Sequence, residues 1–433
     1  MTEDDTGALP SEISVTRDRR SPRRLSSAFF SIVVVGLGIQ VLNVASGPLV
    51  AHMLGPTGRG ELATVMVVAI LCSQVAFGGF PAAVSHAVAV AKAPALDVLR
   101  GLRTLWNLLA LIGSAVACGL TIVLLPDGPH VRLLVVAVAV ATFVTTWQFV
   151  MIAMLLGEGH VRHVNLFRLT TTLLYVGSIV AIFVIRRTDH PAVVLLINSG
   201  AMMVGLVVVR AKLDRPTGDL SVRVARSEIS TFARRSFVSG IGALDSLGID
   251  QLLVGIILGQ ASLGLYAVAF SITSLPLLVL HGVGAALLPR MAVRSNVESV
   301  RMLRRWVAAS IGIDAAIVVA LQLVLGPAIR LAFGSAFVPA IATARILVLA
   351  WAFLAFRRVL TAAAQAQGRA KAASIAELSC GAILIVAVAI GSHLRDIEGA
   401  ALGLGFAAVI SCVWLGLLVS WTESSLRAAR PVG

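Results

Sequence analysis

Two stretches of this chain decide its fold: LGPTGRGELA at residues 54–63 and LGQASLGLYA at residues 258–267. They lie 204 residues apart and share the pattern L-G-x4-G-x2-A. The ungapped match extends over residues 49–84 with ten identities in 36 positions, more than chance gives a chain rich in Leu, Ala, Val and Gly. The sequence therefore predicts two related halves.

The composition indicates a membrane protein. Of 433 residues, 58% are hydrophobic and 13% are charged, whereas soluble domains run near 45–50% and 25%. The mean hydropathy is +0.95. These values exclude a soluble enzyme, a disulfide scaffold and a nucleic-acid-binding domain, even though the isoelectric point is near 11.2.

The apolar runs predict an all-α polytopic membrane protein with twelve transmembrane helices. At about 20 residues for each crossing, twelve spans need roughly 240 residues, close to the hydrophobic share of the chain. We expect helices at 28–50, 62–84, 105–125, 133–156, 169–185, 193–209, 237–258, 265–288, 306–326, 341–364, 375–392 and 400–421.

These spans form two lobes of six helices. Residues 27–209 make the N-lobe and residues 237–421 the C-lobe, joined by a basic cytoplasmic linker at 210–236. A disordered tail at 1–26 and a short tail at 422–433 complete the chain. Six helices is an even number, so the two copies share one membrane orientation and are related by an axis along the membrane normal. Such an arrangement predicts a central cavity between the lobes.

The basic residues set the orientation. Of the 35 Lys and Arg residues, 26 fall in segments on the side of the N terminus and six on the opposite side. Positive charge gathers in cytoplasmic loops. The pattern predicts that both termini are cytoplasmic.

Several kinds of chemistry are not expected. None of the three lysines follows a glycine, so there is no Walker A loop for ATP. The four cysteines lie in apolar runs without CxxC spacing, which favours small core residues over a metal site or a disulfide. No serine–histidine–acid arrangement is present. We expect no cofactor, no metal and no catalytic residue.

The first helix carries a polar stripe. Gly36, Gln40, Asn43 and Gly47 recur at spacings of 4, 3 and 4 residues and share one face. Pro48 follows, and we expect it to kink the helix.

The repeat partner, the seventh helix, has a similar stripe of Ser239, Gly242, Ser246 and Asp250. Two interpretations stay open: the stripes face an aqueous cavity, or they pack tightly against other helices through small residues.

Embedded acids occur only in the second half: Asp245, Asp250, Asp314 and Glu377. Ionisable groups at bilayer depth are costly and commonly functional. We regard Asp250, Asp245 and Asp314 as candidates for ion coupling. Asp250 could carry a proton or hold a sodium ion, or its carboxyl could simply hydrogen-bond a neighbouring helix.

Three arginines fall in the tenth helix. Arg345, near its start, either binds phosphate bidentately or snorkels to the outer interface. We expect Arg357 and Arg358 to end the apolar span and snorkel inward.

Several motifs resemble the Wzx-type oligosaccharide flippases of the MOP exporter superfamily. Residues 52–61 are similar to the LGPxGRGE turn of that family, and Asp250 with residues 258–269 resembles its D…LG…GLYAVA segment. Similar matches follow in order at 288–290, 333–347 and 367–369, so the resemblance covers residues 28–421.

The resemblance implies a twelve-helix MOP-type fold and a flippase, not an enzyme. It would move undecaprenyl-pyrophosphate-linked oligosaccharide from the inner to the outer leaflet by alternating access, driven by an ion gradient or the membrane potential. We expect the substrate to contact Gln40, Asn43, Arg59 and Arg345.

Other functions stay open. A multidrug exporter of the same superfamily would typically have an aromatic pocket. This chain has only 6% aromatic residues. The lipid II flippase branch usually has fourteen helices. A major-facilitator transporter would need a GxxxDRxGRR-type loop, which residues 91–104 do not supply, and a membrane polymerase or acyltransferase would need a large extracytoplasmic loop.

The implied partners are a lipid-linked oligosaccharide, membrane lipids and H⁺ or Na⁺. A polysaccharide polymerase and glycosyltransferases are further possible partners, and nucleic acid is not expected. The implied location is the bacterial plasma (inner) membrane.

Overall fold

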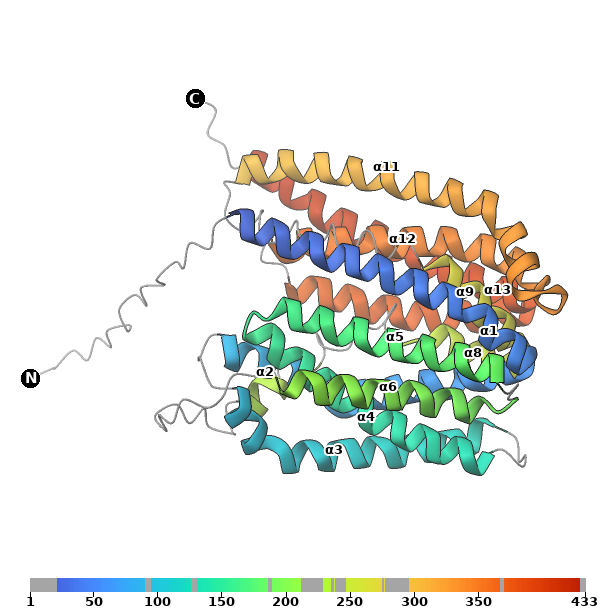
Figure 1. Cartoon of the computed structure of the whole chain (residues 1–433). Helices are drawn as coiled ribbons and strands as arrows, with labels where there is room; N and C mark the ends of the chain where they lie inside the picture. Colours follow the sequence, from blue (N-terminus) through green and yellow to red (C-terminus); the bar gives the residue numbers. More distant parts are fainter. Residues whose placement is uncertain are drawn as a thin grey trace, which may run out of the picture.

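The computed structural model of the chain describes residues 22–89, 95–125, 131–185, 189–211, 229–234, 237, 247–274, 276, 296–366 and 370–428. These residues form helices and the turns between them, and no strand occurs among them. The long helices run side by side in one bundle (Figure 1). The all-α fold predicted from composition is confirmed.

The first half contains six helices. Their bounds are α1 Pro22–Phe77, α2 Phe80–Ala89, α3 Ala95–Leu124, α4 Val131–Gly157, α5 Val161–Ile185 and α6 Pro191–Arg210.

The described part of the second half begins with α8 Ile249–Leu258 and α9 Gln260–Thr273. It continues through α11 Asn296–Ala328, a π-turn η1 Ile329–Phe333, a 3₁₀ turn η2 Ser335–Phe337, α12 Ala340–Ala366 and α13 Ala370–Ala428.

Eight of the described helices are long and apolar enough to cross a membrane. Two of them, at Val35–Phe77 and Ala372–Leu418, are 43 and 47 residues long, about twice the 20 residues that one crossing needs. Each of these two contains a break and covers two of the expected spans. With the shorter α8 and α9, every one of the twelve expected spans overlaps a helix of the structure.

The break in α1 lies at Gly55, not at Pro48. Gly55 has φ 65° and ψ −178°, and it is the one residue of α1 with non-helical dihedral angles. Glycine adopts this left-handed φ without steric cost. Pro48 keeps helical angles inside α1, and a kink at that residue stays a prediction.

The first and last described helices share one end of the bundle. The start of α1 and the end of α13 are at the same end of the bundle as the start of α3 and the end of α6 (Figure 1). An even number of crossings produces this arrangement.

Large apolar side chains cover the outside of the bundle. Val123 is 81% exposed, Leu323 74% and Leu331 86%. A soluble protein rarely exposes so much apolar surface, whereas a bilayer accepts it. Helix association in lipid depends on close packing instead of the hydrophobic effect.

The two segments of α13 show such packing. A Cβ added at Gly391 would overlap the carbonyl of Gly399, and one at Gly399 would overlap the carbonyl of Gly391. The backbones therefore touch directly on either side of the turn at Arg395 and Asp396. Small residues permit this contact, as is usual between membrane helices.

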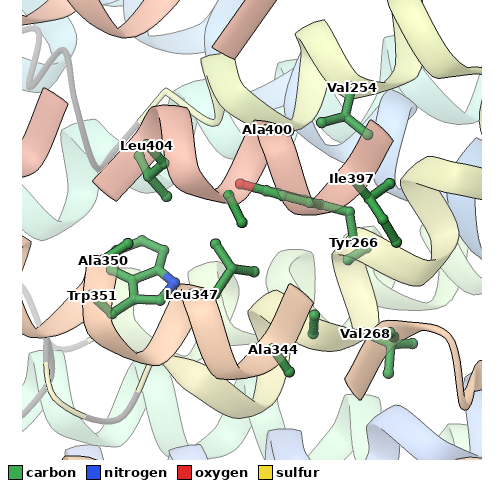
Figure 2. Close-up of a cluster of buried hydrophobic side chains, with 14 of the residues drawn as sticks. Val254, Tyr266, Val268, Ala344, Leu347, Ala350, Trp351, Ile397, Ala400 and Leu404 are labelled. Carbon is green, nitrogen blue, oxygen red and sulfur yellow. The ribbon is translucent and has the colours of Figure 1, made fainter. Parts of the chain in front are cut away.

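The largest cluster of buried apolar residues is built mainly from the second half and also takes in Ala51 and Ala63 of α1. It joins α8, α9, α12 and α13, and Figure 2 shows Val254, Tyr266, Leu347 and Leu404 from these four helices converging on it. Two other clusters belong to the first half. A fourth joins α12 and α13 near Leu360.

Candidate functional site at the seam between the halves

The two repeat stretches meet each other in the structure. A Cβ added at Gly60 would overlap the main-chain carbonyl of Gln260, and a Cβ added at Gly264 would overlap that of Pro56. Gly60 and Gly264 are 204 residues apart, as are Pro56 and Gln260. The contact is therefore reciprocal, as expected for two halves related by a two-fold axis. We call this glycine contact, formed by these four residues, the seam.

The turns that lead into the seam also match. Gly55 has φ 65° and ψ −178°, and its repeat partner Gly259 has φ 83° and ψ 175°. Both conformations favour glycine. The 204-residue repeat predicted from weak sequence identity is thus present in the backbone itself.

Side-chain hydrogen bonds extend the contact between the halves. The hydroxyl of Thr64 donates to Oε1 of Gln260 at 2.7 Å. Farther along α1, Nε2 of Gln40 donates to the hydroxyl of Ser274 at 3.2 Å. Gln40, a predicted substrate ligand, is therefore bonded to α9.

The end of the first segment of α1 contacts the turn before α12. Nε2 of His52 lies 3.0 Å from the carbonyl oxygen of Ala332. A Cβ at Gly47 would lie 3.5 Å from the ring of Phe333. From Gln40 to His52 the helix rises about 18 Å at 1.5 Å per residue, so the halves are joined over this length. The polar stripe contacts other helices at Gln40 and Gly47, as the packing interpretation of the stripe expects.

Asn43 differs from its neighbours on the stripe. Its residue surface is exposed, whereas Gln40 and Gly47 are half-buried. Its carbonyl accepts a hydrogen bond from the hydroxyl of Ser46 at 3.0 Å. Asn43 and Gln40 share one face of α1, and of the pair Asn43 presents the more accessible polar group.

The carboxyl group of Asp250 has a direct partner. Asp250 is 3% exposed, and the hydroxyl of Tyr266 donates to its Oδ2 at 2.9 Å. Tyr266 is completely buried in the core of the second half (Figure 2). The bond ties α8 to α9. This geometry provides the structural role that the sequence left open for Asp250.

A second buried set of charges lies among α11, α12 and α13. Nη1 of Arg357 is 2.7 Å from Oε2 of Glu377, and Arg357 is 0% exposed. The expectation that Arg357 snorkels was wrong, because the carboxylate on the next helix compensates its charge inside the bundle. Arg358 is half-buried.

Asp314 belongs to the same region. It is 7% exposed, and its Oδ1 has no hydrogen-bond partner among the described residues. The thiol of Cys412 lies within electrostatic range of both Arg357 and Asp314. The three helices therefore bring two acids and one base to a confined, apolar part of the second half. We call Asp314, Arg357 and Glu377 the C-terminal charge cluster.

The two predicted phosphate ligands lie apart. Arg59 is half-buried and lies within electrostatic range of Tyr175 of α5 in the first half. Arg345 is exposed, and its Nη2 would lie 3.9 Å from a Cβ at Gly326 of α11. No contact of the described residues joins either arginine to Gln40 or to the other arginine.

Other site predictions have different outcomes. Asp245 lies outside the described residues. Within the described ranges, no group of three His, Cys, Asp or Glu side chains is close enough to hold a metal ion. Sequence reasoning missed Tyr266 and Thr64, although Tyr266 lies in the GLYAVA stretch and its hydroxyl at membrane depth needs a partner.

The fold and the seam define the class of protein: a polytopic helical membrane protein with the fold that transporters of the MOP superfamily share. The chain belongs to the polysaccharide biosynthesis protein family, whose model matches residues 26–294. No curated protein has a significantly matching sequence.

Solved structures with the same fold include transporters and a flippase. An inward-facing multidrug resistance MATE family transporter of the MOP superfamily has a TM-score of 0.68 at 17% identity, covering 92% of this chain and 100% of its own. The lipid II flippase MurJ, in an inward closed conformation, has a TM-score of 0.69 at 14% identity, covering 92% and 87%. A MOP superfamily transporter from Pyrococcus furiosus has a TM-score of 0.63 at 16% identity, covering 93% and 96%.

Proposed function

We propose that the protein flips an undecaprenyl-pyrophosphate-linked oligosaccharide from the inner to the outer leaflet by alternating access. Membership of the polysaccharide biosynthesis family supports a glycan substrate, and the lipid II flippase among the similar folds supports a lipid-linked one. The observation that carries the mechanism is the reciprocal seam, where two equivalent turns close one end of the bundle.

The seam is suited to opening. It consists of main-chain contacts at glycines and a few side-chain hydrogen bonds, and such bonds between membrane helices are worth about 0.6 kcal/mol each, with a maximum near 1.7. Separating the halves therefore costs a few kcal/mol, a range in which two states interconvert and a ligand shifts their populations. In this proposal the seam faces outward, because Arg59 follows the break of α1 at Gly55, in a connection that the charge distribution places outside.

The substrate ligands remain those inferred from the sequence. Asn43 and Gln40 present amide groups along α1, where sugar hydroxyls would find donors and acceptors. Arg345, exposed beside α11, would bind a phosphate group. Arg59 would do so only when its contact region near Tyr175 opens.

Ion coupling falls to the acids of the second half. Asp314 is the strongest candidate, because it is buried with an unbonded Oδ1 and lies in the C-terminal charge cluster. Asp250 is a weaker one, since its carboxylate already has the Tyr266 hydroxyl. Asp245 stays a candidate on sequence alone. The ion, H⁺ or Na⁺, supplies the energy.

The remaining assignments complete the proposal. The lobes are residues 27–209 and 237–421, with the basic segment 210–236 between them. The tails at 1–26 and 422–433 lie on the cytoplasmic side, and the helices α1 and α13 extend into them at residues 22–26 and 422–428. The protein lies in the bacterial inner membrane. Glycosyltransferases supply the substrate and a polysaccharide polymerase takes the product.

A cross-link across the seam tests this function. In a background without the four native cysteines, Thr64→Cys and Gln260→Cys are combined, because these two side chains are 2.7 Å apart at their oxygens. Proteoliposomes carry a fluorescent undecaprenyl-pyrophosphate-linked oligosaccharide, and a membrane-impermeant quencher reports its leaflet. Oxidation should stop flipping and a reductant should restore it.

The matched control is a cross-link within the first half. Ser114→Cys with Ala139→Cys joins α3 to α4, where the Ser114 hydroxyl is 3.0 Å from the Ala139 carbonyl. This pair should flip equally before and after oxidation. Undiminished flipping by the oxidised seam pair would refute alternating access through the seam. Export of ethidium without any flipping would favour the multidrug exporter.

A further inference from the structure

A groove runs along the outer flank of the first half, away from the seam. It has a volume of about 610 Å³ and is lined by α3, α4 and α6. These helices lie on the side of the bundle opposite α11 (Figure 1). The groove is thus separate from the interface between the halves.

Three arginines surround one end of this groove. Arg100 and Arg103 lie in the first turns of α3, and Arg210 is the last residue of α6. Among the described residues, an acidic partner accompanies only Arg100, whose Nη1 is 3.6 Å from the exposed Asp97. Three cations around one opening repel each other, so an anion placed there would relieve that repulsion.

The groove changes character along its length. Arg100, Arg103, Asn107 and Leu111 follow one another at spacings of 3, 4 and 4 on a single face of α3. From Arg100 to Leu111 the helix rises about 16 Å. Along α3 the groove therefore presents two charged side chains, then the amide of Asn107, and then the apolar Leu111.

The apolar part is open toward the surface of the bundle. Leu111 is 58% exposed and Val207, on the facing helix α6, is 65% exposed. Trp147 also lines the groove and contacts Trp106, one helical turn beyond Arg103, edge to face with ring centroids 6.3 Å apart. Tryptophan at this position is typical of the headgroup region of a bilayer. The groove therefore begins in the headgroup layer and continues into the hydrocarbon.

We infer that the groove binds one anionic glycerophospholipid of the bilayer. Arg100, Arg103 and Arg210 hold its phosphate, Asn107 meets the ester region, and an acyl chain lies between Leu111 and Val207. Basic pockets between membrane helices on the cytoplasmic side suit such headgroups. Both a bound lipid and the flipped substrate contain phosphate, but the position on the flank, remote from the seam, assigns this site to a bilayer lipid. The inference does not depend on the proposed function.

Lipid-dependent thermal stability and native mass spectrometry of the full chain test the site. Phosphatidylglycerol should raise the melting temperature of the wild type more than phosphatidylcholine does, and should remain bound in the gas phase. Each arginine at a membrane surface adds about five-fold to anion affinity. The double variant Arg103→Ala with Arg210→Ala should therefore weaken phosphatidylglycerol binding by roughly 25-fold.

Two further variants separate lipid binding from folding. Arg162→Ala removes an exposed arginine of α5 outside the groove and should bind lipid as the wild type does. Val207→Trp fills the acyl path at an exposed position and should reduce binding with all three arginines in place. Equal lipid binding by the double arginine variant and Arg162→Ala would overturn the inference. Arginine-dependent binding of undecaprenyl phosphate, but not of phosphatidylglycerol, would also overturn it, because the occupant would then be the carrier lipid.

Discussion

Adding one methyl group to the seam should open it. Gly60→Ala places a Cβ where the carbonyl of Gln260 lies, and backbone on both sides must move. Overpacking of this kind typically costs 1–3 kcal/mol. The contact exists only while the halves are together, so the cost falls on the closed state and the ratio of open to closed molecules should rise by about 5- to 150-fold.

A buried reporter measures that ratio. Ala63 is 5% exposed and packs in the core beside the seam. In a cysteine-free background, Ala63→Cys should react with an impermeant thiol reagent at a rate proportional to the open fraction. We expect Gly60→Ala to accelerate this reaction by at least five-fold.

Two glycine variants serve as controls. Gly38→Ala lies on the same helix with no atom within 4 Å of its added Cβ, so its labelling rate should be unchanged. Gly391→Ala creates an equally severe overlap, but with Gly399 inside the second half. It should lower the melting temperature without faster labelling. If Gly60→Ala labels no faster than Gly38→Ala, the seam is not a gate.

Four further substitutions have expected outcomes. Glu377→Gln leaves Arg357 charged and buried, so the free energy of unfolding, measured by steric trapping, should fall by about 3 kcal/mol. Most of that loss should be recovered when Arg357→Met is added. Additive losses in the double variant would contradict the ion pair. Asp250→Asn should keep folding and substrate binding, and an unchanged ion dependence of transport in proteoliposomes would leave Asp250 with only a structural role. Tyr266→Phe removes the hydroxyl that donates to that carboxylate and should lower the free energy of unfolding by about 1 kcal/mol. An identical loss in an Asp250→Leu background, where residue 250 cannot accept a hydrogen bond, would mean that the bond contributes nothing. Arg345→Ala should abolish polysaccharide export at a normal membrane level, with partial rescue by Arg345→Lys because lysine lacks the bidentate fork; full activity of the alanine variant would make Arg345 an interfacial anchor.

Hydropathy predicted where the chain crosses but not where its helices begin. We expected a helix from residue 306, whereas α11 starts at Asn296, and one from 105, whereas α3 starts at Ala95. The added turns contain arginines such as Arg305 and Arg100, which end an apolar run without ending a helix. The thickness of the bilayer sets the length of the apolar run. The helix itself continues past that run, because its backbone hydrogen bonds do not depend on apolar side chains.

Individual polar residues were easier to find than their partners. Asp250 and Asp314 are conspicuous because acids are rare in apolar helices. Their surroundings depend on which helices adjoin, and the sequence of one helix does not contain that information. Arg357 and Glu377 did offer a signal, since opposite charges on consecutive antiparallel helices can meet. The sequence analysis interpreted Arg357 alone, as a residue that ends an apolar span, and therefore missed its pairing with Glu377.

The reciprocal seam has a consequence for ancestry. An interface in which residue i meets residue j and the copy of j meets the copy of i is isologous, the arrangement of a symmetric homodimer. Gly60 with Gln260 and Gly264 with Pro56 satisfy that relation within one polypeptide. A six-helix precursor, inserted twice in the same direction, could have formed this closure between two separate molecules. After gene fusion, Gly60 and Gly264 would have stayed under the same steric requirement. The embedded acids would have accumulated only in the second half.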